Sequence, residues 1–406
     1  MLASLRQVLL GGALLVALVA GDSAHLGRRL AMEVRLGSPT GPAAATPSNV
    51  VTAPVVAAVP RGSGRAVVQS PILFDPAVSL STILFVDSAH GWAAGAGAII
   101  ASTDGGRSWS RQYDGPERLL QLSFVDPMHG LARSSTHLLL TTDGGNTWLP
   151  AGEPRRPLDR VQLVTLDSGW GVAGAALYRT ADAGRSWLAQ QTPGPIGAFC
   201  FVDRNHGWVV NAPSAAPGVF VTGDNGSAWQ AATISPGAER GVGRHTLRCT
   251  TPNVLWDLFD IGAYTAGEGY RLSRSGDGGQ TWTAIVQNSF SVPSEPVRPS
   301  RVQQGPGPYP GVLDAVDATT AYLTGYCSAC GGSGFTALGR TLDGGTTWRN
   351  LVFSDLPGIG AVVSFPTRTH GWVLTERSVG PGEVDSAIIA TADSGNTWRQ
   401  QYPPPR

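Results

Sequence analysis

From about residue 71 to its end, the chain alternates short apolar runs with polar turns. Each repeat starts with an apolar run, passes a polar turn and continues with a second run that opens with Gly-Trp or a substitute. FVDSAHGWAAG from Phe85 and FVDRNHGWVV from Phe201 are two examples. Runs of this length, bounded by turn-forming residues, are typical of β-strands. The pattern therefore predicts two antiparallel strands, A and B, in each repeat.

An eight-residue motif, Ser/Thr-x-Asp-x-Gly-x-Ser/Thr-Trp, follows each of these strand pairs. It first occurs as STDGGRSW at Ser102, and six further copies start at Thr141, Thr180, Thr222, Ser275, Thr341 and Thr391. The Asp carboxylate can accept hydrogen bonds from N–H groups of its own turn, and Gly supplies a position of positive φ. We interpret each copy as a tight turn between strands C and D whose Trp returns to the core. The fourth copy has Ala228 in place of the second hydroxyl residue, which predicts a weaker turn.

Seven such motifs interleave with seven strand pairs. In the first repeat, strand A ends near Phe85, B starts at Trp92, C ends at Ser102 and D starts at Trp109. Four antiparallel strands repeated seven times predict an all-β fold, a seven-bladed β-propeller, in which ring closure protects the strand edges. We expect the propeller to occupy residues 71–406.

The residues before the repeats predict export. Arg6 is followed by the apolar run 8–20, and small residues precede Asp22, so residues 1–21 have the pattern of a signal peptide. The apolar run is shorter than the roughly 20 residues needed to span a bilayer; an uncleaved anchor is the alternative. Residues 22–70 are rich in Ala, Pro, Gly and Ser and are predicted to be a flexible spacer. We therefore expect a periplasmic, extracellular or membrane-associated protein.

The spacing of the motifs indicates where the repeat carries insertions. From the B-strand aromatic to the motif Trp there are 17 residues in the first repeat (Trp92 to Trp109) but 26 in the last (Trp372 to Trp398). The extra residues are expected in B–C loops, and others fall in D–A connections, above all 283–310. In a four-stranded meander both kinds of connection lie on the face opposite the motif turns. Loops carry function on rigid scaffolds, so we place the binding surface on that face, over blades four to seven.

Charge narrows the choice of partner. Charged residues make up 14% of the chain and the net charge is zero, which argues against a nucleic-acid surface. Guanidinium groups bind carboxylates bidentately, and the alternative for loop arginines is simple solubility. The candidate partner-binding residues lie in D–A connections and are Arg155, Arg156, Arg160, Arg240, Arg244, Arg298 and Arg301.

The motif carboxylates are predicted to be structural. They are Asp104, Asp143, Asp182, Asp224, Asp277, Asp343 and Asp393. Equivalent turns on seven different blades cannot converge on one site, so we expect no catalytic residue, metal or cofactor among them. The repeated histidines of the A–B turns (His90, His129, His206 and His370) follow the same argument and are expected to bond locally.

The four cysteines form two candidate pairs. Cys327 and Cys330 make a CxxC in the B–C loop of blade six, and with export we expect a local disulfide there rather than a zinc or redox site. Cys200 and Cys249 lie on the A strands of adjacent blades, four and five. They can pair across the blade boundary or remain buried thiols, and the sequence favours neither.

These motifs resemble the Asp box, or bacterial neuraminidase repeat. The paired FxDxxHGWxxG element makes the chain similar to the photosystem II stability/assembly factor-like repeat family of secreted or lumenal propellers. The resemblance covers nearly all of residues 71–406. It implies a non-catalytic scaffold whose protein partner belongs to a membrane complex under assembly. We expect such a scaffold to be monomeric.

Asp boxes also occur in sialidases, xyloglucan-active glycosidases and sorting receptors, so a glycan-active propeller, either a glycoside hydrolase or a lectin, is the alternative. A glycosidase needs two carboxylates about 5 to 9.5 Å apart. The sequence contains no Arg-Ile-Pro element of the sialidase kind. The carboxylates available on the decorated face are Glu239, Glu268, Glu295, Glu376, Glu383 and Asp385, and their spacing singles out no pair.

Overall fold

The computed structural model describes residues 64–404, except 70–71, 74, 76–77, 236–242, 265–266, 289–301, 328–334, 354–360 and 381–382. The chain divides into two units, residues 1–51 and 52–406, and all described residues belong to the second. The predicted signal peptide lies outside them. Within the described residues no helix is long and apolar enough to cross a membrane.

All regular structure in the described residues is β. The strands are β1 Gly64–Val68, β2 Leu80–Phe85, β3 Gly91–Ser102, β4 Ser110–Arg118, β5 Gln121–Phe124, β6 Gly130–Arg133, β7 Leu138–Thr141, β8 Leu149–Pro150, β9 Arg160–Leu163, β10 Gly169–Ala173, β11 Ala176–Thr180, β12 Leu188–Ala189, β13 Ile196–Phe201, β14 Gly207–Asn211, β15 Val219–Thr222, β16 Gln230–Ala232, β17 Arg244–Thr251, β18 Val254–Tyr264, β19 Gly267–Ser275, β20 Thr283–Asn288, β21 Tyr309–Ala315, β22 Ala321–Cys327, β23 Phe335–Thr341, β24 Arg349–Phe353, β25 Ala361–Ser364, β26 Gly371–Gly380, β27 Glu383–Thr391 and β28 Thr397–Tyr402.

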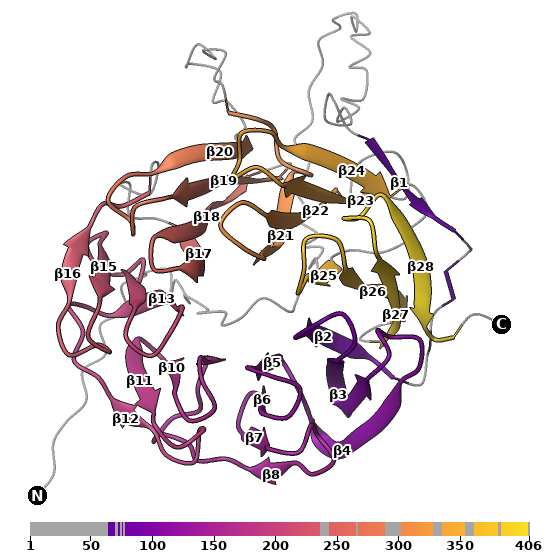
Figure 1. Ribbon diagram of the computed structural model, residues 1–406, viewed down its shortest axis with the longest axis horizontal. Helices are drawn as coiled ribbons and strands as arrows, with labels where there is room; N and C mark the ends of the chain where they lie inside the picture. The colour runs from indigo at the N-terminus through magenta and orange to yellow at the C-terminus, as the bar shows by residue number, and fades with distance from the viewer. Residues whose placement is uncertain are drawn as a thin grey trace, which may run out of the picture. The chain divides into compact units, whose positions relative to one another are not determined.

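Consecutive strands pair antiparallel into sheets. Four sheets have four strands each (β5–β8, β9–β12, β13–β16 and β17–β20), and β2–β4 form a three-stranded sheet. A nine-stranded sheet contains the sets β21–β24 and β25–β28. Figure 1 shows these strand sets following one another around a common axis, with the first strand of each set innermost. The all-β propeller prediction is confirmed; the count of seven blades stays a prediction.

Two elements differ from the predicted repeat. The predicted strands B and C of the first repeat form one element, β3, whose first half pairs with β2 and whose second half pairs with β4. The change occurs at Gly97, whose φ of 71° is in the left-handed region that favours glycine. The other difference is β1, which lies within the predicted spacer. It pairs in parallel with β24 and with β28 and so joins the last two sets into one sheet.

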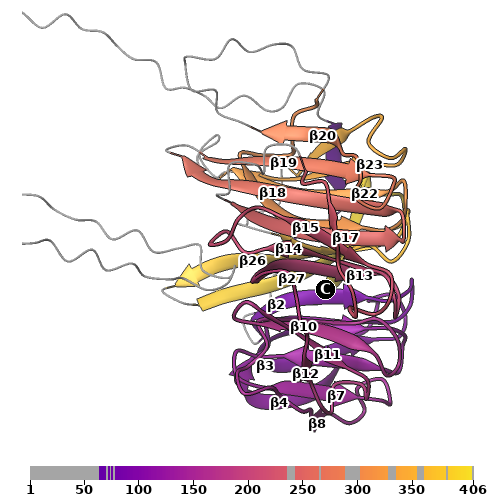
Figure 2. The ribbon, with the colours of Figure 1, turned by 90° about the vertical axis from the view of Figure 1, so that its left-hand side faces the viewer.

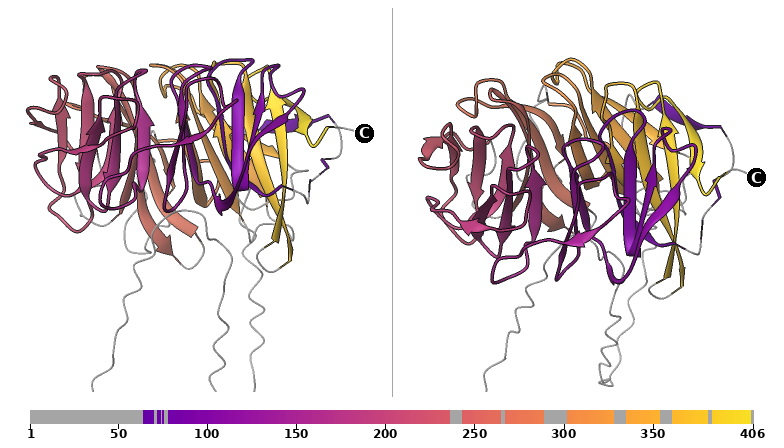
Figure 3. Two further views of the ribbon diagram at one scale, coloured as in Figure 1. Left: turned by 90° about the horizontal axis from the view of Figure 1, so that it is seen from below. Right: turned by 60° about the horizontal axis from the view of Figure 1, so that its bottom comes forward.

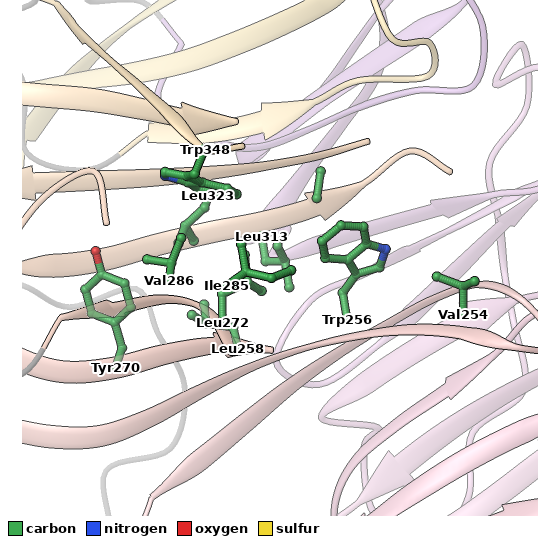
Figure 4. Packing of buried hydrophobic residues seen from close by; sticks show 11 residues of the cluster. Val254, Trp256, Leu258, Tyr270, Leu272, Ile285, Val286, Leu313, Leu323 and Trp348 are labelled. Atoms are coloured by element: carbon green, nitrogen blue, oxygen red, sulfur yellow. The ribbon is translucent and has the colours of Figure 1, made fainter. Parts of the chain in front are cut away.

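Stacked aromatic rings fill the boundaries between neighbouring sets. Trp92 stacks on Phe124 with ring centroids 3.7 Å apart, and Trp170 stacks on Phe201 at 3.8 Å. Each pair joins a B strand to the A strand of the next set. Burying rings of this size contributes much of the packing free energy. Figure 4 shows another boundary, where Trp256 of β18 packs in one cluster with Leu313 of β21 and Leu323 of β22.

The innermost strands are also joined by polar side chains. The Gln121 amide of β5 bonds both the carbonyl and the N–H of Val161 in β9, and Gln162 of β9 bonds Phe201 of β13 in the same way. The Phe85 N–H donates to Ser364 Oγ at 2.8 Å, which joins the last set to the first. These bonds satisfy backbone groups at the inner edges of the sets. The boundary between the last set and the first is therefore joined, like the two boundaries above, by hydrogen bonding between a polar side chain and the backbone of the neighbouring inner strand.

Candidate functional site

Each Asp box closes on itself through its carboxylate. In the first box Asp104 Oδ1 accepts the Ser108 N–H at 2.9 Å, and Oδ2 accepts the Ser108 hydroxyl at 2.6 Å. The Ser102 hydroxyl donates to Oδ1 and accepts the Gly106 N–H at 2.7 Å. The other boxes repeat this arrangement, except for one bond in the fourth. Carboxylates engaged in this way hold turns, and they sit on separate strand sets.

The fourth box lacks the hydroxyl bond to its carboxylate. Asp224 Oδ1 still accepts the Ala228 N–H at 2.9 Å, but Ala228 has no hydroxyl to donate to Oδ2. Replacing Ala228 by serine should restore that bond and raise the free energy of unfolding, by a small amount because the site is exposed. Urea denaturation of both proteins measures the change. A less stable serine variant would contradict this view of the turn.

Hydrogen bonding in the boxes predicts acid sensitivity. The Thr281 hydroxyl holds the pKa of Asp277 at about 2. The Ser108 and Thr147 hydroxyls likewise lower the pKa values of Asp104 and Asp143. A carboxyl with a depressed folded-state pKa contributes stability above its unfolded pKa of about 3.9 and loses it as the pH falls through the folded value. The urea concentration at the unfolding midpoint should therefore decrease as the pH is lowered from about 4 to about 2. Asp277→Asn should flatten part of this slope; an unchanged slope would argue against the assignment.

The A–B turns lie on the same face as the boxes. The Gly105 N–H of the first box donates to the Ala89 carbonyl of the turn before β3 at 2.9 Å, and later sets repeat this contact. We call this side the box face. The opposite side, formed by the B–C and D–A connections, is the loop face. Figures 2 and 3 show β18 with β19, and β26 with β27, reaching beyond the other strands.

The predicted insertions in the fifth and seventh repeats lengthen strands rather than forming loops alone. Pairing of β18 with β19 continues to Tyr264 and Gly267, and pairing of β26 with β27 continues to Gly380 and Glu383. Backbone groups in an extension need partners, and a continued ladder supplies them. The loop face therefore carries two protruding hairpins.

The structure describes four of the seven predicted arginines. Arg155 and Arg156 are exposed in the connection before β9. Arg160 starts β9 and donates to the Gly197 carbonyl, while Arg244 starts β17 and pairs with Asp260 at 3.4 Å. Arg240, Arg298 and Arg301 lie outside the described residues. The four arginines belong to two separate connections, one that leads into β9 and one that leads into β17, and two of them have structural partners.

Two of the candidate carboxylates on the loop face point away from each other. Glu376 shares its side of β26 with Leu374, which packs toward β2 and β3, and Asp385 shares its side of β27 with Ile389, which packs toward β22–β24. Burial raises the pKa of Glu376, and Arg118 lies 3.7 Å from it. Asp385 accepts a bond from Arg377 at 2.7 Å. These two carboxylates cannot act on one glycosidic bond. Glu239 and Glu295, and the side chains of Glu268 and Glu383, lie outside the described residues.

The structure shows a disulfide for one of the two candidate cysteine pairs. Cys200 of β13 and Cys249 of β17 form a disulfide with a Cα–Cα distance of 5.9 Å, which joins two neighbouring strand sets. Cys327 ends β22 and Cys330 lies outside the described residues, so their disulfide stays a prediction. Among the described residues no group of three or more His, Cys, Asp or Glu side chains could hold a metal ion.

A family model described as the photosynthesis system II assembly factor YCF48 matches residues 70–200. The resemblance to the assembly-factor repeat is confirmed. A solved structure of YCF48 bound to a D1 peptide is 19% identical, with a TM-score of 0.53; the match covers 82% of this chain and 99% of that one. YCF48 from Cyanidioschyzon merolae is 16% identical, with a TM-score of 0.50 and coverage of 78% and 98%.

A solved enzyme structure shares the fold as well. The GH74 xyloglucanase from Xanthomonas campestris is 14% identical, with a TM-score of 0.52; the match covers 85% of this chain but 55% of the enzyme. No curated protein sequence shows significant similarity to the chain. At such identities the likeness to YCF48 structures and to the xyloglucanase shows a common fold alone.

Proposed function

We propose that the chain is an exported, non-catalytic scaffold that binds a protein partner through its loop face during assembly of a membrane complex. The observation that carries this proposal is the contrast between the two faces. Box carboxylates are engaged in their own turns, whereas the loop face presents exposed Arg155 and Arg156 and two protruding hairpins. The match to the YCF48 family supports the assembly role, and YCF48 itself has been solved with a peptide bound.

Arg155 and Arg156 suit an acidic partner segment. A guanidinium group offers five N–H donors in a planar fork that matches a carboxylate. Both side chains are exposed, so they can contact a partner without leaving a packed position in the fold. Glycan hydrolysis is supported less well, because Glu376 and Asp385 face opposite sides of their sheet.

Affinity capture with chemical cross-linking in the native host tests the proposal. The double variant Arg155→Gln with Arg156→Gln should recover about tenfold less of the cross-linked partner, equivalent to about 1.4 kcal/mol of binding. The matched control removes two exposed box-face arginines, Arg185 and Arg204, in the same way. An equal loss in the control, or full capture by the loop-face variant, would refute loop-face binding. Amino-terminal sequencing of the mature protein tests export, since a cleaved signal would leave a start near Asp22.

A further inference from the structure

A hollow of about 630 Å3 lies on the box face where the β25–β28 set meets the first Asp box. Its walls come from β28, from the first and last boxes and from the turn that holds Ser88 and Ala89. The volume is in the range of small-molecule sites, about 300–1,000 Å3. The proposed partner surface is on the opposite face and does not include this hollow.

Two arginines on its wall have no acidic partner among the described residues. Arg107 donates to the backbone carbonyl of Asp104 at 3.0 Å, and Arg399 donates through Nε to the Gln69 side chain at 2.5 Å. Both side chains are exposed. The hollow also contains Asp104 and Asp393, but both oxygens of each carboxylate already accept bonds from their own boxes. Apart from the bonds to Asp104 and Gln69, no hydrogen bond of the Arg107 or Arg399 guanidinium is found in the described part of the chain, so their other N–H groups can bind an anion.

The histidine on the same wall has lost the carboxylate found in the equivalent turns. His90 and His206 each bond an aspartate three residues earlier, at 2.8 Å, and His129 does so at 3.0 Å. In the last repeat Thr367 replaces that aspartate, and His370 Nδ1 instead lies 3.1 Å from the Thr369 hydroxyl and 3.4 Å from that of Thr367. The last A–B turn thus has one negative charge fewer than the three other turns that contain a histidine.

A glutamine side chain also lines the hollow. In the first set Gln112, three residues after the box Trp, accepts a bond from Trp92 and donates to the Gly144 carbonyl at 2.9 Å. Gln401 holds the same position after Trp398 and lines the hollow. There the Trp372 indole donates directly to the Gly105 carbonyl, and no hydrogen bond of the Gln401 side chain is found in the described part of the chain. Its amide can therefore bind a ligand.

We propose that this hollow binds a small organic carboxylate with an apolar body. Arg107 and Arg399 hold the carboxylate, Gln401 supplies a further polar contact, and the apolar part packs on Ala390 and the edge of Trp372. Sites for such ligands combine apolar surface with a few polar groups that fix the orientation. This hollow offers both, with polar residues in the majority.

Calorimetric titration of the purified protein with N-acetyl-leucine, its amide and inorganic phosphate tests this. The acid should bind at least tenfold more tightly than the amide, which lacks the charge, and more tightly than phosphate, which lacks the apolar body. Arg107→Gln with Arg399→Gln should weaken binding of the acid at least tenfold, and Thr367→Asp should weaken it too by restoring the missing charge. Thermal unfolding of each variant checks that the fold is retained.

Arg185→Gln is the matched control, because Arg185 occupies the position of Arg107 in the third box and makes the same bond to its box carbonyl, at 3.1 Å. This variant should bind the acid as the unchanged protein does. The assignment would be overturned if the protein bound the acid and the amide, or the acid and phosphate, with equal affinity. It would also be overturned if the Arg185 variant lost as much affinity for the acid as the Arg107 and Arg399 double variant.

Discussion

Replacing Trp372 by alanine should lower the free energy of unfolding by about 3–5 kcal/mol. Trp372 is 2% exposed and stacks on Phe85 with ring centroids 3.5 Å apart. Its indole donates to the Gly105 carbonyl at 3.1 Å. The residue therefore joins the last strand set to the first, and its removal leaves both a cavity and a carbonyl without its partner.

Trp170→Ala is the matched variant for this measurement. Trp170 is equally buried and stacks on Phe201 at 3.8 Å, but it joins consecutive sets, and its indole N–H has no partner among the described residues. Urea unfolding followed by circular dichroism should show a similar loss for both variants, larger for Trp372 by about 1 kcal/mol because a hydrogen bond is also lost. A loss below 1 kcal/mol for Trp372→Ala would mean that the ring is not closed at this boundary.

Removing the Cys200–Cys249 disulfide by a double serine substitution should cost about 4 kcal/mol. The bond closes a loop with a sequence separation of 49 and joins the inner strands β13 and β17. It restricts the unfolded chain, and the loop-entropy model gives a cost of this size. Urea unfolding of the oxidised protein and of the double variant measures the difference.

Thiol counting provides the control for the disulfide. Alkylation of the unfolded, unreduced protein followed by mass spectrometry should leave Cys200 and Cys249 unmodified. Cys327→Ser with Cys330→Ser serves as the comparison, because it leaves the bond between β13 and β17 intact. Alkylated Cys200, or a stability change below 1 kcal/mol in the Cys200 and Cys249 variant, would contradict the assigned bond.

Local chemistry made the box turns predictable. The Ser102 hydroxyl, Asp104 and the glycine at position 106 are close in sequence and bond to one another, so the pattern of residue types is enough to specify the turn. The strand pairs between boxes were predictable for a similar reason, since alternation and turn residues act over short distances.

Features that depend on contacts between distant segments were not predictable. Strand β1 looked like spacer because its composition is weakly patterned; it is ordered by parallel pairing with residues near 351 and 397. The sequence placed Cys200 and Cys249 on adjacent sets but could not show whether their side chains face each other. The hollow at the last set corresponds to one unusual feature of the sequence, the threonine at 367 in place of a repeated aspartate. That feature could not be interpreted from the sequence, because Arg107, on the wall of the same hollow, is distant along the chain.

The proposed function places the protein partner on the loop face and leaves the box face, with its hollow, clear of that partner. Hydroxyl-radical footprinting of the cross-linked complex against the free protein tests this division most directly. Partner binding should reduce labelling of loop-face residues near Arg155 and along the β18–β19 and β26–β27 hairpins, while Met128 and Leu166, exposed in box-face turns, keep their labelling. Protection of Met128 and Leu166 with the hairpins unchanged would contradict it.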